Sequence, residues 1–348
     1  MIARLAAALL AACSPDVLPT QGPPGGDSLP PPPSRRLCTT GVGVLMAGAA
    51  WPDLESAVAA SVPGDILWVC PGIWPQHTPL VAPHAGQLTL AGVTLDPRDA
   101  VIDGEFVPDQ TEWLAHPDLR IKALSFTRFG IDKVSVVLAL RAGSGAFEDL
   151  IFHGNGSELG FPMLITVSAW ETEPVIIRRV LVEGNVGAAA IDISGRSGSA
   201  HIENLECVNN IHVKCIDIID SSCGAQTTVS MRSLTLADNS DSNPVDISGA
   251  VHATVNGLEI SNNKVLSVYP LLRLTRGSCR VTPTHIQPQL VFDVRNASIT
   301  DNESPGQYSV LQTTGCTPAP AQLSHVRFRD TRSSATSPPG APPAPPST

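Results

Sequence analysis

LTLADN, residues 234–239, belongs to a six-residue pattern that recurs along the chain and decides the fold. Each copy alternates apolar and variable residues and ends in asparagine; the copies are LIFHGN (150–155), VLVEGN (180–185), LECVNN (205–210), LTLADN (234–239), LEISNN (258–263) and ASITDN (297–302). By subtraction, successive asparagines lie 30, 25, 29, 24 and 39 residues apart. Irregular self-similarity at this period predicts a solenoid in which each repeat makes one turn.

The pattern within each repeat predicts strands rather than helices, because apolar residues recur at every second position. Weaker copies, ALSFTRF (123–129) and VRFRDT (326–331), extend the series at both ends. A second alternating run follows several of the asparagines: AIDIS (190–194), CIDII (215–219) and PVDIS (244–248). A further short run precedes each copy, so we expect about three short strands per turn. Aromatic residues make up only 4% of the chain, so small and aliphatic side chains must fill the core.

The repeated asparagine has a physical explanation in a stacked solenoid. Equivalent residues of successive turns lie about 4.8 Å apart, so side-chain amides at an inward-facing corner can bond to one another. A lone buried amide is costly, whereas a stacked row satisfies itself. Asparagine also tolerates the left-handed conformation of a tight turn. We therefore expect a structural ladder, the alternative being six surface turns; its members are Asn155, Asn185, Asn210, Asn239, Asn263 and Asn302.

WPDLESAVAASVPGDILWVCPGIWPQ, residues 51–76, carries a family resemblance. It resembles the N-terminal cap of right-handed parallel β-helices of the pectin-lyase-like class, where a short amphipathic helix covers the open end of the solenoid. The resemblance implies an all-β, right-handed parallel β-helix with an N-terminal capping helix. Asp53 or Pro52 would start this helix, and Pro63-Gly64-Asp65 would end it. The apolar residues that would cover the first turn are Leu54, Ala57, Val58 and Ala60.

The first residues, MIARLAAALLAAC, combine one arginine with an apolar run too short to span a bilayer. Leu10-Ala11-Ala12-Cys13 resembles the bacterial lipobox, which implies lipidation of Cys13; an ordinary secretory signal is the alternative. Ser14 in place of Asp implies sorting to the outer membrane, with the protein periplasmic or surface-exposed. The expected organisation is a signal peptide (1–12), a Pro-rich linker (13–37), the β-helix domain (38–331) and a Pro-rich tail (332–348).

An exported protein meets an oxidising compartment, so we expect some of its cysteines to pair. Cys38 and Cys70 flank the first segment of the fold and form the first expected bridge. Cys279 and Cys316 follow the asparagine motif at similar offsets and form the second. Cys207 fills an apolar position of its motif, so we expect it to pack as a small hydrophobic residue.

Charge and motifs exclude several functions. The net charge of −10 argues against a nucleic-acid partner, which requires clustered Lys and Arg. No metal or redox motif is present, so no cofactor is expected apart from Ca²⁺ at an acidic cluster. Of the four motifs of polygalacturonase-like enzymes, only Arg120-Ile121-Lys122 occurs, and we interpret it as an alternating strand.

One polar constellation stands out when the strands after each asparagine are aligned. Their apolar neighbours would face inward and the polar residues outward, in a column of Thr166, Asp192, Asp217, Asp246, Arg273 and Gln312. Three carboxylates so close repel one another, by about 1 kcal/mol per adjacent pair even in water. Asp192, Asp217 and Asp246 could bind Ca²⁺ or sugar hydroxyls, with Arg273 as a clamp for an anionic group of the ligand, and the three aspartates are also the candidates for acid–base catalysis. The structural alternative is a solvated polar face ended by a compensating arginine.

These observations predict a lipid-anchored cell-envelope protein whose β-helix is a non-catalytic binding or structural module for a carbohydrate or protein ligand. The alternative is a polysaccharide lyase or glycoside hydrolase that acts on acidic polysaccharide. Residues 277–289 form an insertion, and insertions in solenoids form loops where partners can bind. Candidate sugar-stacking tryptophans are Trp68, Trp74, Trp113 and Trp170, although Trp68 is expected to pack in the first strand.

Overall fold

The computed structural model describes the chain in segments, and nearly all of its regular structure lies in one unit. The described residues are 29–104, 112–130, 136–141, 143–157, 162–168, 174–194, 198–220, 227–241, 244–265, 270–275, 290–304, 311–314, 321–329 and 332–333. The chain divides into two units, Met1–Pro31 and Pro32–Thr348. Only residues 29–31 of the first unit are described, and they contain no helix or strand.

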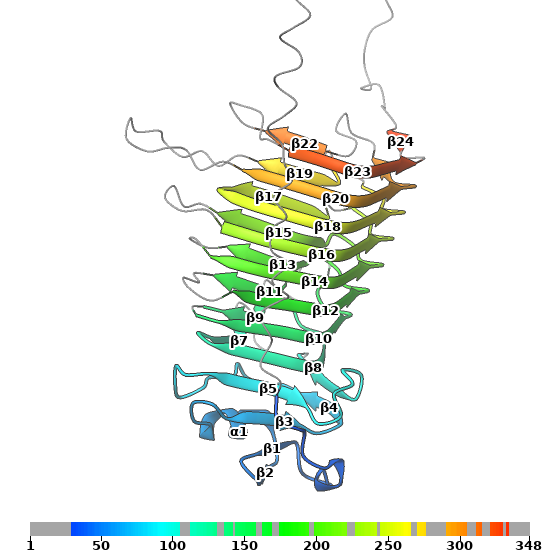
Figure 1. The fold of residues 1–348 in the computed structure, drawn as a ribbon. Helices are drawn as coiled ribbons and strands as arrows, with labels where there is room; N and C mark the ends of the chain where they lie inside the picture. The colour runs from blue at the N-terminus through cyan, green and yellow to red at the C-terminus, as the bar shows by residue number, and fades with distance from the viewer. Residues whose placement is uncertain are drawn as a thin grey trace, which may run out of the picture. The chain divides into compact units, whose positions relative to one another are not determined.

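Two sheets dominate the described part of the second unit (Figure 1). The larger runs in the order β2 (Ala49–Trp51), β1 (Val44–Met46), β3 (Ile66–Val69), β5 (Leu88–Gly92), β8 (Leu119–Thr127), β10 (Gly145–His153), β12 (Val175–Glu183), β14 (Ser199–Val208), β16 (Thr227–Ala237), β18 (Val251–Ser261), β20 (Val291–Thr300), β23 (Ala321–Arg329), with β4 (Gly72–Pro75) and β6 (Ala100–Asp103) paired alongside. The smaller runs in the order β22 (Leu311–Thr314), β19 (Leu272–Thr275), β17 (Val245–Gly249), β15 (Lys214–Asp220), β13 (Ala189–Ser194), β11 (Met163–Ser168), β9 (Val136–Leu140), β7 (Glu112–His116).

From β7 to β20 the chain alternates between the two sheets, so one strand of each makes most of one turn. Every described pairing from β3 onward is parallel, including the short pair β21 (Glu303–Ser304) and β24 (Arg332–Ser333). Parallel strands that are neighbours in space but separated by a crossover define a solenoid. The prediction of an all-β parallel solenoid is therefore confirmed.

The long strands of the larger sheet are bent in the middle. Between β10 and β12 the register runs up to Glu148 and resumes at Leu150, so Asp149 is skipped. Asp149 has a left-handed backbone, with φ of 55°, which turns the strand sharply. The equivalent residues with positive φ in β8 to β20 are Ala123, Asp149, Arg179, Asn204, Ser233, Gly257 and Asn296. Each turn thus contains two straight segments in the larger sheet and one in the smaller, which matches the predicted three strands per turn.

The solenoid interior is filled by apolar residues of the strands from β5 to β20, as the alternation predicts. Aromatic side chains gather near the N-terminal turns, where Trp113 lies edge-on to Phe126 and Phe129 with ring centroids 5.7 and 5.5 Å apart. Phe126 also stacks on Phe152 at 5.0 Å. The later turns are packed mainly by Ile, Leu, Val and Ala, and Phe292 of β20 is the exception among the described residues.

The N-terminal end is closed by a hairpin and a helix. Strand β1 pairs antiparallel with both β2 and β3, and α1 (Leu54–Ala60) follows directly. Asp53 caps this helix, since its side chain accepts a hydrogen bond from the backbone N of Ser56 at 2.7 Å. Leu54, Ala57 and Val58 are buried as predicted. Ala60 is exposed, and the helix ends there, before the Pro-Gly-Asp turn, so its expected contribution to the cap is wrong.

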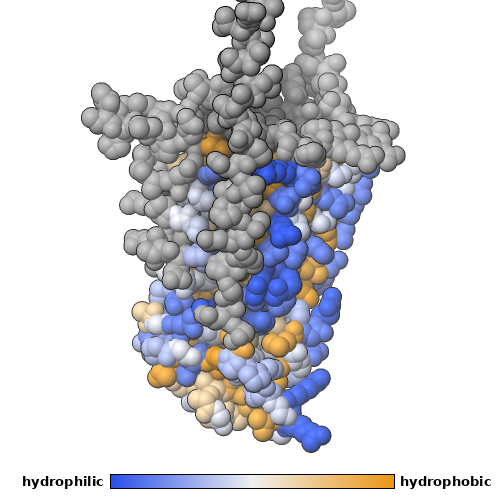
Figure 2. Space-filling model, viewed as in Figure 1, coloured by the Kyte–Doolittle hydropathy of each residue, from blue (hydrophilic) through white to orange (hydrophobic). Residues whose placement is uncertain are grey.

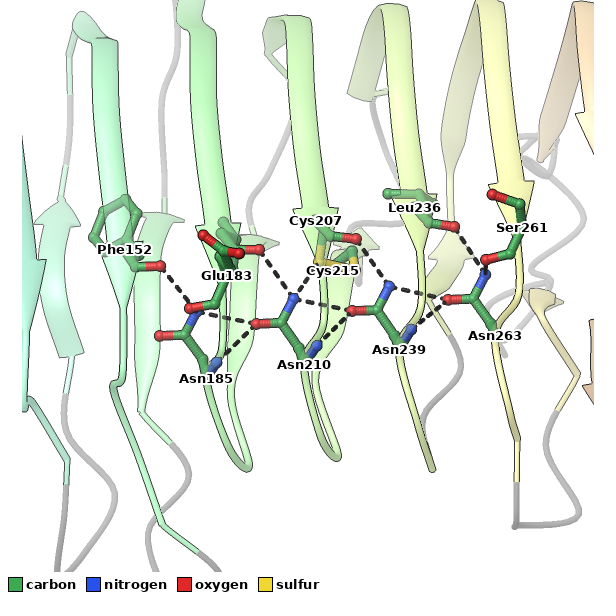
Figure 3. Close-up of a disulfide and its surroundings, with 11 residues drawn as sticks. Phe152, Glu183, Asn185, Cys207, Asn210, Cys215, Leu236, Asn239, Ser261 and Asn263 are labelled. Carbon is green, nitrogen blue, oxygen red and sulfur yellow. Dashed lines mark hydrogen bonds between the residues drawn. A yellow bond between two sulfur atoms is a disulfide. The ribbon is translucent and has the colours of Figure 1, made fainter.

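The asparagine ladder is present at one corner of the solenoid (Figure 3). The Nδ2 of each asparagine donates to the Oδ1 of the next at 2.9–3.0 Å. The backbone N of each donates to the same oxygen at 2.9–3.1 Å. Each Nδ2 also donates to a carbonyl of the preceding turn at 2.8–3.0 Å. The six amides are buried and fully bonded, so the structural interpretation holds.

One detail of the corner differs from the prediction. The left-handed residue is not the ladder asparagine but the residue before it, as Gly184 with φ of 64° illustrates at Asn185. The seven such residues are Arg128, Gly154, Gly184, Asn209, Asp238, Asn262 and Asp301. The ladder asparagine keeps an ordinary backbone because its side chain has to point inward to stack. Phe129 holds the ladder position in the turn below Asn155, and its backbone N donates to Asn155 Oδ1 at 3.1 Å.

Two disulfides occur among the described cysteines. Cys38 and Cys70 are bonded, as predicted, with Cα atoms 5.6 Å apart. Cys207 is bonded to Cys215, with Cα atoms 5.9 Å apart, so the prediction that Cys207 only packs as a hydrophobic residue is wrong. Eight residues separate this pair, and the corner at Asn210 brings them face to face across the interior. Cys13 and the expected pair of Cys279 with Cys316 lie outside the described residues.

Candidate functional site

The predicted polar column exists on the outer face of the smaller sheet. Thr166 pairs in register with Asp192, Asp192 with Asp217, and Asp217 with Asp246. Arg273 and Gln312 occupy the next two register positions. From Thr166 to Arg273, the residues on either side in each strand, such as Ile191 and Ile193, are buried in the core, so this part of the column faces outward. Adjacent members stand on strands about 4.8 Å apart.

The column is less solvated than a simple polar face would be. Asp217 is 8% exposed and Asp246 is 3% exposed, although both point away from the core. Asp192 is intermediate. The expectation of a solvated face is therefore wrong for two of the three carboxylates. Buried carboxylates are costly unless they are paired, which raises the question of what pairs them.

Lys214 is the main partner of the two buried carboxylates. It is not a member of the column, so aligning the column positions in the sequence does not identify it. Its Nζ lies 2.8 Å from Asp217 Oδ2 and 3.2 Å from Asp246 Oδ2, so one ammonium bridges two strands. Burial alone would lower the pKa of Lys214, but its hydrogen bond to Asp217 and the charges of Asp217 and Asp246 raise it overall. Arg273 adds a second cation, with Nε 3.4 Å from Asp246 Oδ1. Lys214 stands three residues before Asp217, a spacing that could have drawn attention to it.

Asp192 differs from its two neighbours. Among the described residues it receives no hydrogen bond and no ion pair. Burial first, and then the negative charge of Asp217, raise the pKa of Asp192 from its ordinary value of 3.8 to about 6. Lys214 opposes this shift without reversing it. Asp192 can therefore change its protonation state near neutral pH.

Several acceptor atoms of the column are buried without a hydrogen-bond partner in the described part of the chain. They are Thr166 Oγ1, Asp217 Oδ1 and Asp246 Oδ1. The approach of Arg273 to Asp246 Oδ1 is an ion pair rather than a hydrogen bond. Unsatisfied buried polar atoms are rare in proteins, and three of them in one column, at Thr166 on one side of Asp192 and at Asp217 and Asp246 on the other, indicate a place where hydrogen-bond partners are missing.

The larger sheet carries a different polar surface, a charge column. The residues aligned in it are Lys122, Glu148, Arg178, Glu203, Arg232, Asn256 and Arg295. Glu148 is central, with Oε1 2.8 Å from Arg178 Nη2 and Oε2 3.4 Å from Lys122 Nζ. A band of hydrophilic residues runs along this sheet (Figure 2). Because its charges alternate in the N-terminal half and pair with one another, we interpret this column as structural.

The remaining predicted motifs do not assemble into a site. Ile121 of Arg120-Ile121-Lys122 is buried in β8, which confirms an alternating strand. His201 Nδ1 is hydrogen-bonded to Ser230, and burial lowers the pKa of His201. Thr254 separates this pair from Asp293 in their register column, so no Ser-His-Asp set forms.

The tryptophans offer little surface for sugar stacking. Trp113 is fully buried in the aromatic cluster, so it cannot be a platform, and Trp68 packs as expected at 8% exposure. Trp74 is partly buried, and its Nε1 donates to Cys70 O at 2.7 Å. Trp170 and the insertion at 277–289 lie outside the described residues.

Two searches of the described residues bear on cofactors and membranes. They contain no cluster of three or more His, Cys, Asp and Glu side chains arranged to hold a metal ion. In the same residues, no helix has the length and apolar character that a bilayer crossing requires.

In comparisons with known proteins, no family model, no curated protein and no solved structure matches the chain. The fold and the column therefore have to be interpreted from their own geometry.

Proposed function

We propose that this chain is a non-catalytic binding or structural module of a bacterial cell envelope, built as a pectin-lyase-like β-helix and tethered to the outer membrane through lipidated Cys13. The column of Asp192, Asp217, Asp246 and Arg273 binds its ligand, a carbohydrate or a protein. The observation that carries the proposal is the continuous register of these residues on one outer face. A repeating row of hydrogen-bonding groups suits a repeating ligand such as a glycan.

The ion pairs favour binding over catalysis. Asp217 and Asp246 share Lys214, whose ammonium contacts both carboxylates and holds them in place. A carboxylate oxygen that is already bonded to an ammonium is not free to transfer a proton to a substrate. Two disulfides fit an exported protein, since disulfides persist in oxidising compartments.

A polysaccharide lyase or glycoside hydrolase remains the second candidate because of one observation. Asp192, with a pKa of about 6, stands next to Asp217 in register. Their strands are about 4.8 Å apart, near the roughly 5–5.5 Å that separates the carboxyl pair of retaining glycosidases. In that function Asp192 would be the acid and Asp217 the nucleophile.

The test of binding against catalysis uses the purified full chain and a panel of acidic and neutral polysaccharides, with and without Ca²⁺. Both binding and chain cleavage are measured. We expect binding without cleavage, weakened in the Asp217→Asn variant. Cleavage that Asp217→Asn abolishes while the fold is retained would instead establish an enzyme.

Tethering is tested separately. Cells that process lipoproteins are fed labelled palmitate, and we expect the wild-type chain to take up label and fractionate with the outer membrane. The Cys13→Ser variant should remain unlabelled. Label on both chains, or on neither, would refute the lipid anchor without bearing on the ligand site.

A further inference from the structure

The charge of the acidic column is balanced at one end only. Its two cations, Lys214 and Arg273, contact Asp217 and Asp246, and neither forms an ion pair with Asp192. Three carboxylates therefore face two cations, and the excess negative charge lies at the Asp192 end. Since Asp192 is also the more exposed of the three aspartates, an external cation can reach it most easily.

The unused hydrogen-bonding capacity of the column consists of two carboxylate oxygens, which accept, and one hydroxyl, which can accept or donate. Thr166 Oγ1 stands directly beside Asp192 in register and is in a residue only 7% exposed. Asp217 Oδ1 and Asp246 Oδ1 continue the row on the other side. Ionised carboxylates only accept hydrogen bonds, so a ligand completes this column by donating. An acidic sugar would bring more acceptors and a second negative charge, which is unfavourable here.

The polar part of the column begins at Thr166. The next two positions of the column are Ala139, which is fully buried, and Ala115, which is partly exposed, and neither carries a polar side chain.

We propose that the column binds a glycan that carries free primary amines, with an ammonium group held against Asp192 and Thr166 and hydroxyl or amine donors directed to Asp217 and Asp246. This inference rests on the proposed binding function and names the ligand class for that site. An ammonium supplies three hydrogen-bond donors and the missing positive charge in one group. Arg273, at the far end of the column, prevents the cationic chain from extending in that direction.

The test uses the full chain and three oligosaccharides matched in length: glucosamine oligomers, their N-acetylated counterparts and galacturonate oligomers. Titration calorimetry measures each affinity. N-acetylation removes the charge but keeps the sugar backbone, so it isolates the contribution of the amine. We expect the glucosamine oligomers to bind at least about ten-fold more tightly than either of the others.

Variants locate the contact. Asp192→Asn keeps the shape of the side chain and removes its charge, and should weaken glucosamine binding at least about ten-fold. Ser194→Ala, on the next outward position of the same strand, should leave it unchanged. Circular dichroism melts establish that both variants are folded.

The outcomes separate this inference from the function on which it rests. Equal affinity for the amine and acetylated oligomers, or an unchanged affinity in Asp192→Asn, would overturn the amine assignment. Tighter binding of galacturonate that depends on Asp217 would overturn it too, but would leave the binding module intact. Cleavage of any oligomer would overturn the non-catalytic function. Binding of none would overturn the assignment of an amine-bearing glycan, while a protein ligand would still fit the proposed function.

Discussion

Cys207 of β14 and Cys215 of β15 are joined across the corner at which Asn210 turns the chain from one sheet to the other. The Nδ2 of Asn210 lies 3.5 Å from Cys207 Sγ (Figure 3). At this turn a covalent link and the ladder therefore hold the same bend. Elsewhere in the described ladder, hydrogen bonds and packing hold the corner without a disulfide.

Loss of this disulfide should destabilise the protein moderately. Cross-links that close short loops restrict the unfolded chain less than those that close long ones. For the Cys207→Ala/Cys215→Ala double variant we expect the free energy of unfolding to fall by roughly 2.5 kcal/mol. Removing Cys38 and Cys70, which are 32 residues apart rather than 8, should cost about 1 kcal/mol more. Urea unfolding of both variants checks the order, and the reverse order would show that local packing outweighs loop length.

Replacing a ladder asparagine should lower the free energy of unfolding far more than replacing a surface asparagine. Asn239→Ala would leave the backbone N and the Nδ2 of Asn210, and the carbonyl of Cys207, without their partner. Each unsatisfied buried group costs about 1–3 kcal/mol, so we expect a loss of roughly 3–5 kcal/mol. The control is Asn256→Ala, an exposed asparagine of β18 that accepts one hydrogen bond from Asn296. It should cost under about 1 kcal/mol. Similar losses for both would contradict a structural ladder.

Removing the Lys214 ammonium should destabilise the protein, because the carboxylates of Asp217 and Asp246 would stay buried without it. Lys214→Met keeps much of the apolar stem but leaves Asp217 and Asp246 without the shared ammonium. Because Lys214 is partly exposed, we expect a loss of roughly 1–3 kcal/mol at neutral pH, below the range for fully buried pairs. The pKa of Lys214 is raised, so its contribution is fully present below the ordinary lysine value of 10.5 and is lost as pH rises through the raised value. Urea unfolding of wild type and variant from neutral pH upward measures the loss. A loss that stays unchanged at high pH would assign the effect to packing.

Asp192 should make stability depend on pH in the direction opposite to an ordinary ion-paired aspartate. Its folded-state pKa of about 6 lies above its ordinary value of 3.8, so the folded state holds the proton more tightly. The stability associated with that proton is present at low pH and is lost as pH rises from about 4 through about 6. Asp192→Asn abolishes this loss. At about pH 8 the variant should be more stable than wild type by roughly 1–2 kcal/mol, a value reduced for the partial exposure of Asp192.

The measurement for Asp192 is urea unfolding of wild type and Asp192→Asn across this pH range. Below about pH 4 the two curves should coincide, because Asp192 is protonated in both states. A variant less stable than wild type at high pH would mean that the Asp192 carboxylate has a partner that favours its charged form.

Much of the column could be predicted from the sequence, because in a solenoid one register rule applies to every turn. Once AIDIS, CIDII and PVDIS are aligned, the alignment of Asp192, Asp217 and Asp246 follows, and the strand pairings confirm it. The same rule places Thr166 and Arg273. The capping helix was also predictable, because Asp53 and the apolar spacing after it are local signals.

What the sequence by itself determined was the repeating part of this protein: the parallel solenoid, the inward asparagines and the outward column, all set by a pattern with a period. Only the tertiary structure decided which groups meet across a corner or between turns. In the folded protein Cys207 is bonded to Cys215, and the Lys214 side chain extends to Asp246 on the neighbouring strand. Asp217 and Asp246 are buried, whereas Asp192 has no ion pair in the described chain. These contacts depend on side-chain reach and on the three-dimensional packing at each position, which differ from turn to turn and leave no period in the sequence.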